Sequence, residues 1–173
     1  GDLRVTTAND VVLQGGIATD GAYAQIGNGG RNSKGDKSGS IFVEATNGKV
    51  DVIAGLNNSN YAQIGHGGHE SDFLGTRGGT LVTDTIEVRA GTTVQVIGAQ
   101  NNIDVVDGVN SNGSAQSYAQ IGHGGQYVTG SHLAMITVDA GTDLLLKAGL
   151  SNQNYAQIGH GGLFNGADAN GKG

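Results

Sequence analysis

The sequence contains no cysteine, no proline and no tryptophan, and a single methionine among 173 residues. Without cysteine the chain forms neither disulfide bonds nor thiolate metal sites. No apolar run approaches the roughly 18 residues that a membrane-spanning helix needs, so we expect no membrane span. The net charge of -6 disfavours nucleic acid as a partner, because phosphates are bound by patches of lysine and arginine.

Glycine, by contrast, is abundant. There are 33 glycines, and hydrophobic residues make up only 36% of the chain. A broad three-dimensional core is not expected from so small an apolar share. A thin core that repeats along one axis needs fewer apolar side chains, so the composition favours a repeat architecture.

An octapeptide of the form Tyr-Ala-Gln-Ile-Gly-(His/Asn)-Gly-Gly occurs four times. The copies are residues 23–30, 61–68, 118–125 and 155–162. The first copy has Asn28 where the others have His66, His123 and His160. Recurrence of this kind is the signature of stacked structural repeats, so the function is expected to arise from what the copies make together.

Two further apolar patterns precede each octapeptide. The first alternates apolar and polar residues, which predicts strands with one inward face, at residues 3–7, 41–45, 86–90 and 136–140. After a short turn, a second strand is predicted around residues 11–13, 50–52, 94–96 and 144–146. The Tyr-Ala-Gln-Ile segment of the octapeptide is predicted to be a third strand, which its glycines end.

The spacing of these patterns predicts an all-β parallel β-helix, or β-solenoid, of about four coils with three strands each. The octapeptide tyrosines are 38, 57 and 37 residues apart, so equivalent strands lie over one another in parallel rather than in successive hairpins. We expect a single domain over residues 1–173, with coils at about 1–40, 41–79, 80–132 and 133–173. The longer middle interval indicates an insertion over residues 100–117, either a projecting hairpin or an enlarged loop.

The chain resembles the haemagglutinin-type repeats of filamentous-haemagglutinin-like bacterial exoproteins, which are secreted by the two-partner route. The resemblance lies in the Gly-Asp-Leu-Arg-Val opening at residues 1–5 and in the Ile-x-Val-x-Ala-Gly-Thr runs that begin at Ile86 and Ile136. It implies a right-handed β-helix, a location outside the cell or on the bacterial surface, and a role in attachment or as a fibrous scaffold.

In such a solenoid the polar and aromatic residues of the octapeptide are expected to form rows along the axis, each a structural ladder of like side chains. A row of three histidines has a second interpretation, as a Zn²⁺ or Cu²⁺ site, but metal ions need converging ligands rather than a line. The expected ladder residues are Tyr23, Tyr61, Tyr118, Tyr155, Gln25, Gln63, Gln120, Gln157, Asn28, His66, His123 and His160.

Several apolar residues occupy strand positions that should face solvent. In register along a shaft they would form stripes, and apolar stripes mark contact surfaces. The candidates for lateral contact are Phe42, Ile53, Ile97 and Leu145.

These features predict a structural extracellular protein that stacks head to tail into a fibre or adhesin shaft. No residue is expected to be catalytic or to bind a cofactor. An alternative is a surface-binding module whose loops recognise a glycan or a receptor, and a third hypothesis is a β-helical carbohydrate-active enzyme. A second copy placed directly after Gly173 would put its Tyr23 41 residues beyond Tyr155, close to the internal spacing, so we expect self-association through the ends of the solenoid.

Overall fold

The computed structural model describes residues 1–71, 84–100, 116–130, 132 and 134–164. Within these residues it has twelve strands and no helix, and therefore no helix that could cross a membrane. Each coil contributes three strands, which are β1 (Leu3–Thr7), β2 (Val11–Gln14), β3 (Ala24–Ile26), β4 (Ile41–Ala45), β5 (Val50–Ile53), β6 (Ala62–Ile64), β7 (Thr85–Ala90), β8 (Val94–Ile97), β9 (Tyr118–Ile121), β10 (Met135–Ala140), β11 (Leu144–Lys147) and β12 (Tyr155–Ile158).

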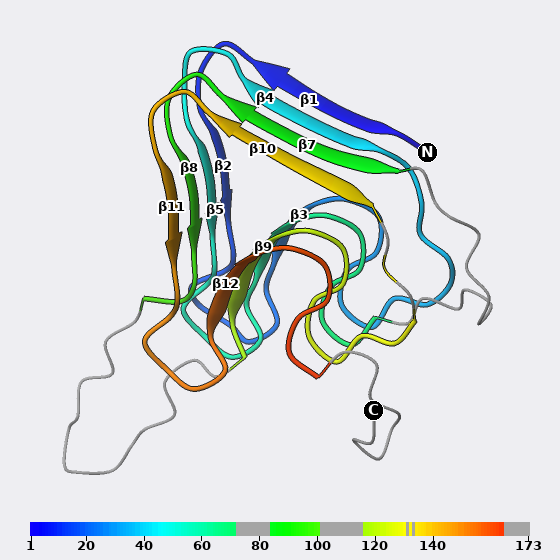
Figure 1. Ribbon diagram of the computed structural model, residues 1–173. Helices are drawn as coiled ribbons and strands as arrows, with labels where there is room; N and C mark the ends of the chain where they lie inside the picture. The colour runs from blue at the N-terminus through cyan, green and yellow to red at the C-terminus, as the bar shows by residue number, and fades with distance from the viewer. Residues whose placement is uncertain (72–83, 101–115, 131, 133, 165–173) are drawn as a thin grey trace, which may run out of the picture.

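The strands form three parallel sheets, each with one strand from every coil. Their orders are β1-β4-β7-β10, β2-β5-β8-β11 and β3-β6-β9-β12. Figure 1 shows the three sheets around a common interior, with β1 to β3 at one end of the stack and β10 to β12 at the other. The predicted all-β parallel β-solenoid of about four coils is confirmed for the described residues.

The register between coils aligns like residues. The predicted inward rows are confirmed, since Ile86 pairs with Ile41 and Ile136, and Val88 pairs with Val43 and Val138. A shift of one residue would turn every inward side chain to the outside, so the apolar alternation fixes this register.

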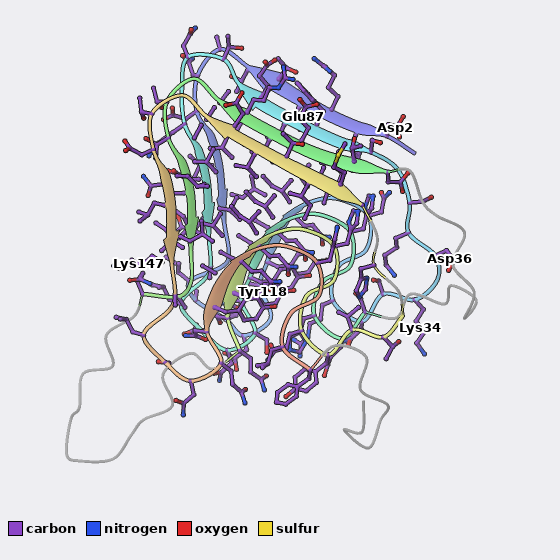
Figure 2. All side chains as sticks on the ribbon, in the orientation of Figure 1. Asp2, Lys34, Asp36, Glu87, Tyr118 and Lys147 are labelled. Atoms are coloured by element: carbon purple, nitrogen blue, oxygen red, sulfur yellow. The ribbon has the colours of Figure 1, made fainter. Side chains whose placement is uncertain are left out.

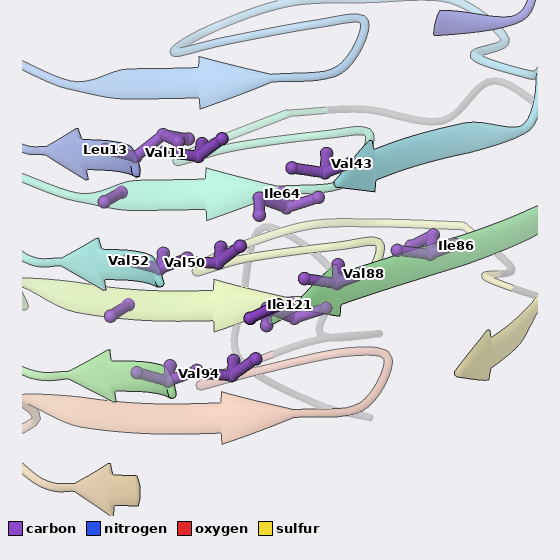
Figure 3. Packing of buried hydrophobic residues seen from close by; sticks show 14 of the residues in the cluster. Val11, Leu13, Val43, Val50, Val52, Ile64, Ile86, Val88, Val94 and Ile121 are labelled. Carbon is purple, nitrogen blue, oxygen red and sulfur yellow. The ribbon is translucent and has the colours of Figure 1, made fainter. Parts of the chain in front are cut away.

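A narrow apolar column fills the space between the sheets. Val43, Val52, Ile64, Val88 and Ile121 are fully buried in it. Figure 3 shows these side chains in layers, one layer per coil. Each buried valine or isoleucine contributes about 1.5–3 kcal/mol relative to an exposed side chain, and stacking supplies a further layer with each coil.

The glycine that ends the third strand is required by the closeness of successive coils. A Cβ atom on Gly65 would lie 1.9 Å from the carbonyl oxygen of Gly122, and one on Gly27 would lie equally close to the oxygen of Gly65. The φ angle of Gly65 is also 155°, in a region that L side chains rarely adopt. Only glycine satisfies both conditions.

The long insertion falls almost entirely outside the described residues. Of the predicted segment 100–117, the structure describes Gln100, Gln116 and Ser117. Ser117 belongs to the shaft, because its Oγ accepts the backbone N–H of Asn60 (3.1 Å).

The fourth coil leaves its apolar face open. Leu144 and Leu146 continue the inward rows of Val94 and Val96, which are fully buried, yet they are 51% and 46% exposed. In the part of the chain that the structure describes, β11 pairs with β8 on one side only. This end therefore presents both apolar side chains and an unpaired strand edge.

Replacing Val88 by aspartate should destabilise the fold by about 4 kcal/mol or more, because a carboxylate would be buried without a partner. Chemical denaturation followed by circular dichroism measures the change. The matched control is Gln14→Asp, an exposed outward position on β2, which should alter stability by less than about 1 kcal/mol. Equal midpoints for Val88→Asp and the wild type would place Val88 outside the core.

Candidate functional site

The octapeptides bring tyrosine, glutamine and histidine side chains into rows that run along the solenoid. The tyrosine row has the bulkiest side chains. The rings of Tyr23, Tyr61, Tyr118 and Tyr155 are stacked with centroids 4.8, 4.8 and 5.0 Å apart and planes within 3° of parallel. Figure 2 marks Tyr118 within this row, whereas Glu87 and Lys147 point away from the interior.

The tyrosine row explains the last glycine of each octapeptide. A Cβ atom on Gly68 would lie 2.5 Å from the hydroxyl of Tyr61, and Gly125 stands in the same relation to Tyr118. Burial raises the pKa of both tyrosines well above the ordinary value, so these phenols stay neutral. The rings therefore act as packing elements rather than as acids or bases.

The glutamine row joins each coil to the next one. The Nε2 group of Gln63 donates to the carbonyl oxygens of Gly122 (2.9 Å) and Gly124 (3.0 Å) in the following coil. Gln25 and Gln120 make the equivalent pairs of bonds, to Gly65 and Gly67 and to Gly159 and Gly161. Gln157, in the last coil, donates to the oxygen of His160 in its own coil (3.1 Å).

The histidine row runs in the same direction. The backbone N–H of Asn28 donates to Nδ1 of His66 (2.8 Å), and that of His66 donates to Nδ1 of His123 (3.0 Å). His123 repeats the bond to His160 (3.2 Å). Each imidazole thus accepts a hydrogen bond from a backbone N–H of the preceding coil.

The hydrogen bond to Nδ1 fixes the tautomer of the imidazole. Because Nδ1 of His66 accepts a hydrogen bond, the proton of the neutral ring is on Nε2, which donates to the carbonyl oxygen of Gly39 (2.8 Å). Nε2 of His160 lies 2.8 Å from the carbonyl oxygen of Ala134 and 3.1 Å from its backbone nitrogen. A second proton on Nδ1 would face a backbone N–H, so the cation does not fit the row.

The electrostatics of the row agree with this geometry. The pKa of His123 is lowered to about 3, first by burial away from water and then by the nearby rings of His66 and His160. Burial also lowers the pKa of His66. Both rings are therefore neutral in the folded chain at pH 7.

The geometry gives the metal hypothesis no support. In His66 and His160 both ring nitrogens already have hydrogen-bond partners. Among the described residues, no group of three or more histidine, aspartate or glutamate side chains is arranged to hold a metal ion. The three rings lie in line at 4.7 and 5.1 Å, as a ladder requires.

A fourth row was not singled out from the sequence. It occupies the position before each tyrosine, where Asn60 Oδ1 accepts the N–H of Ala22 (2.8 Å) and Asn154 Oδ1 accepts that of Ser117 (2.9 Å). The four residues at this position are Ala22, Asn60, Ser117 and Asn154. Because they differ, the repeat does not reveal the row. The signal available in the sequence is that each side chain after the first coil contains an oxygen acceptor.

The candidates for lateral contact do not form one stripe. Ile53 and Ile97 are register partners on the second sheet. Leu145 lies in a different row, where Gln95 is its neighbour. Phe42 is on the first sheet and is covered by the guanidinium of Arg4, 4.0 Å from the ring centroid. Only the Ile53–Ile97 pair remains as a small lateral patch.

Comparison with known proteins gave no match from which a function could be inferred, so the inference starts from these rows. A scan against models of protein families and searches of curated proteins and of solved structures found no significant match. The resemblance to filamentous-haemagglutinin-like repeats stays a prediction from the motifs themselves.

We expect the fold to lose stability in acid. The pKa of His123 is lower in the folded chain (about 3) than in the unfolded chain (about 6.5), so between these values the unfolded chain binds more protons. The histidine contribution is therefore complete above pH 6.5 and is lost as pH falls, by up to about 1.4 kcal/mol per pH unit for each such histidine. Denaturant titrations from pH 8 to pH 4 measure the slope.

The control for this effect is His123→Asn, because an asparagine side chain offers an oxygen acceptor and an amide donor without titrating. This variant should fold at pH 7 and lose less stability on acidification than the wild type. An unchanged slope would show that His123 is not the titrating group.

The glutamine bonds predict a difference between two coils. Gln120→Glu replaces a buried donor with a carboxylate that faces three carbonyl oxygens, and should cost about 3 kcal/mol or more at pH 7. Gln157→Glu loses a single bond within the last coil and should cost about 1 kcal/mol. Urea midpoints of the two variants test this, and equal losses would contradict the inter-coil role of Gln120.

Proposed function

We propose that this protein is a structural β-solenoid whose copies stack head to tail into a fibre or adhesin shaft outside the bacterial cell. The observation that carries the proposal is the open fourth coil. Leu144 and Leu146 expose apolar surface that the equivalent residues of the inner coils bury completely. A further coil placed on this face would bury it in the same way.

The first coil of a second copy has the residues that this position requires. In the inward rows, Leu144 and Leu146 would meet Val11 and Leu13, just as Val50 and Val52 meet them within the chain. The inward rows of the other two sheets likewise have apolar residues in their first and last coils, except that Thr7 begins the row of Ala45, Ala90 and Ala140. Stacking therefore continues the apolar column without placing a charge in it.

An outward row supports the same pairing. Val12 and Leu145 are the exposed apolar ends of a row whose inner members are Asp51 and Gln95. In a head-to-tail stack, Leu145 of one copy becomes the register neighbour of Val12 in the next. Two apolar residues that are isolated on the single chain then cover each other.

The location outside the cell rests on the resemblance to haemagglutinin-type exoproteins. The alternative of a binding module depends largely on loops and on the insertion at 100–117, which lies mostly outside the described residues. The stacking proposal rests on described residues alone.

Electron microscopy of the purified chain at pH 7.5 should show unbranched filaments. Four coils at about 4.8 Å each give an axial repeat of about 19 Å per copy, and fibre diffraction should show both spacings. Particles that stay monomeric at every concentration, with folded circular dichroism spectra, would contradict the proposal.

Two adjacent substitutions separate stacking from general surface effects. Leu146→Glu places a charge on the inward face of the open coil and should raise the concentration needed for assembly at least 100-fold, while the monomer stays folded. Leu145→Glu lies on the same strand with similar exposure, 43% against 46%, but it points outward, where a charge beside Val12 of the next copy stays in contact with water. It should change assembly less than tenfold, and equal effects of the two variants would count against an end-to-end contact.

A further inference from the structure

We propose that Asn28 binds a second copy of this chain, because its side-chain oxygen accepts the backbone N–H of His160 in the preceding copy. The junction that this bond forms joins two unlike ends, so it has a direction. The inference rests on the proposed stacking and specifies its chemistry. It also gives a reason for the one difference among the four octapeptides, which have histidine in every coil except the first.

The internal coils define what a residue in this row must do. In coils two to four, Nδ1 of His66, His123 and His160 accepts the backbone N–H of the preceding coil. The Nε2 group of His66 donates to the carbonyl oxygen of Gly39, shortly before a first strand, and Nε2 of His160 lies 2.8 Å from the carbonyl oxygen of Ala134 in the equivalent place. A member of the row thus needs one acceptor toward the preceding coil and one donor to its side.

Asparagine supplies the same pair of groups. The Nδ2 group of Asn28 donates to the carbonyl oxygen of Ser38 (3.2 Å), just before β4, as His66 donates to Gly39. The amide oxygen is then the remaining acceptor, in the role of Nδ1. Within the described part of the chain this oxygen has no hydrogen-bond donor, whereas the backbone donor of each preceding coil is bonded at the same row in coils two to four.

The neighbouring row at the same end behaves differently. Ala22 stands in the first coil where the later coils have the acceptors Asn60, Ser117 and Asn154. The side-chain acceptor is lost there, but it is kept at Asn28. Position in the first coil alone therefore does not account for the choice of asparagine.

The glutamine row adds two bonds to the junction. In each coil pair, a glutamine amide donates to the two carbonyl oxygens that flank the histidine of the next coil, as Gln120 does to Gly159 and Gly161. At the junction the donor is Gln157, and the corresponding oxygens are those of Gly27 and Gly29. Tyr155 meanwhile stacks on Tyr23, whose ring is the most exposed of its row.

These bonds make the two ends complementary and unlike. The coil-four end offers donors in these rows, the Gln157 amide and the His160 N–H, and the coil-one end offers the oxygens of Gly27, Asn28 and Gly29. Two coil-four ends would place donors against donors, and two coil-one ends would place acceptors against acceptors. The partner is therefore a second copy in the same orientation, and the fibre has a direction.

Asparagine also keeps the junction free of a titrating acceptor. In Asn28→His the acceptor nitrogen is available only in the neutral ring, because the cation presents a proton to the N–H of His160. The charged or titratable groups around this position are His66, Lys37, Asp84 and the Gly1 amino group, with His160 of the preceding copy across the junction. With an ordinary histidine pKa near 6.5, about 90% of free ends are protonated at pH 5.5.

The test measures the critical concentration for assembly of the full chain by sedimentation at pH 8 and pH 5.5, with circular dichroism to confirm folding. Asn28→Ala should raise it about fivefold at both pH values, as expected for one lost hydrogen bond. Asn28→His should stay within about twofold of the wild type at pH 8 and exceed it about tenfold at pH 5.5. The control Asn9→His, in a first-coil turn outside the row, should follow the wild type at both.

The outcomes separate this inference from stacking itself. A wild type that never assembles would defeat the stacking proposal. Assembly of the wild type with Asn28→Ala and Asn28→His indistinguishable from it at both pH values would overturn the role of Asn28 and leave stacking intact.

The direction of the fibre has its own test. A folded Gln157→Glu copy keeps the acceptor end but places a carboxylate at the donor end, so it joins a growing fibre through its first coil and blocks the next addition. Addition at 5% should shorten wild-type filaments at least twofold in electron micrographs, and 5% Asn9→His should not. Unchanged lengths would show that Gln157 takes no part in the junction.

Discussion

The constraint on which this structure depends is the spacing between coils. Parallel strands that pair in register hold equivalent residues about 4.8 Å apart, and the tyrosine centroids show the same distance. At that separation each residue chiefly meets its own counterpart. A valine or a tyrosine packs well against itself, whereas backbone segments that approach closely tolerate only glycine, as at Gly65 beneath Gly122. The composition of the chain, rich in glycine and poor in bulky residues, follows from this rule.

Polar residues meet a stricter requirement in such a stack. Each side chain must find its hydrogen-bond partner in a neighbouring coil that has nearly the same residues at the same positions. Glutamine solves it with an amide that donates to the backbone oxygens of the next coil, as Gln63 does. Histidine solves it with Nδ1, which accepts a backbone N–H from the coil before. A charged side chain in either row would be buried beside a like charge in the next coil, so neutral side chains are favoured.

The sequence predicted the architecture well because each prediction used a period. The inward rows of Val43 and Val88 follow from alternation, and the octapeptide fixes which strands stack. Three features were less accessible. The partners of the polar rows depend on which backbone atoms face each other, which the pattern does not contain. The row of Asn60 and Asn154 varies in identity, so repetition hides it. Which outward apolar residues are neighbours depends on the register of a whole sheet, and lateral contact through them stays a prediction.

The alignment of the glutamine amides has an electrical consequence. Backbone dipoles largely cancel across a sheet, but the side-chain amides of Gln25, Gln63 and Gln120 all point toward the following coil. Their dipoles add along the axis, as peptide dipoles add along an α-helix. Each coil adds to this small permanent dipole, with partial positive charge at the coil-four end. In the proposed shaft these dipoles would add over all copies, so the two tips would attract ions of opposite sign.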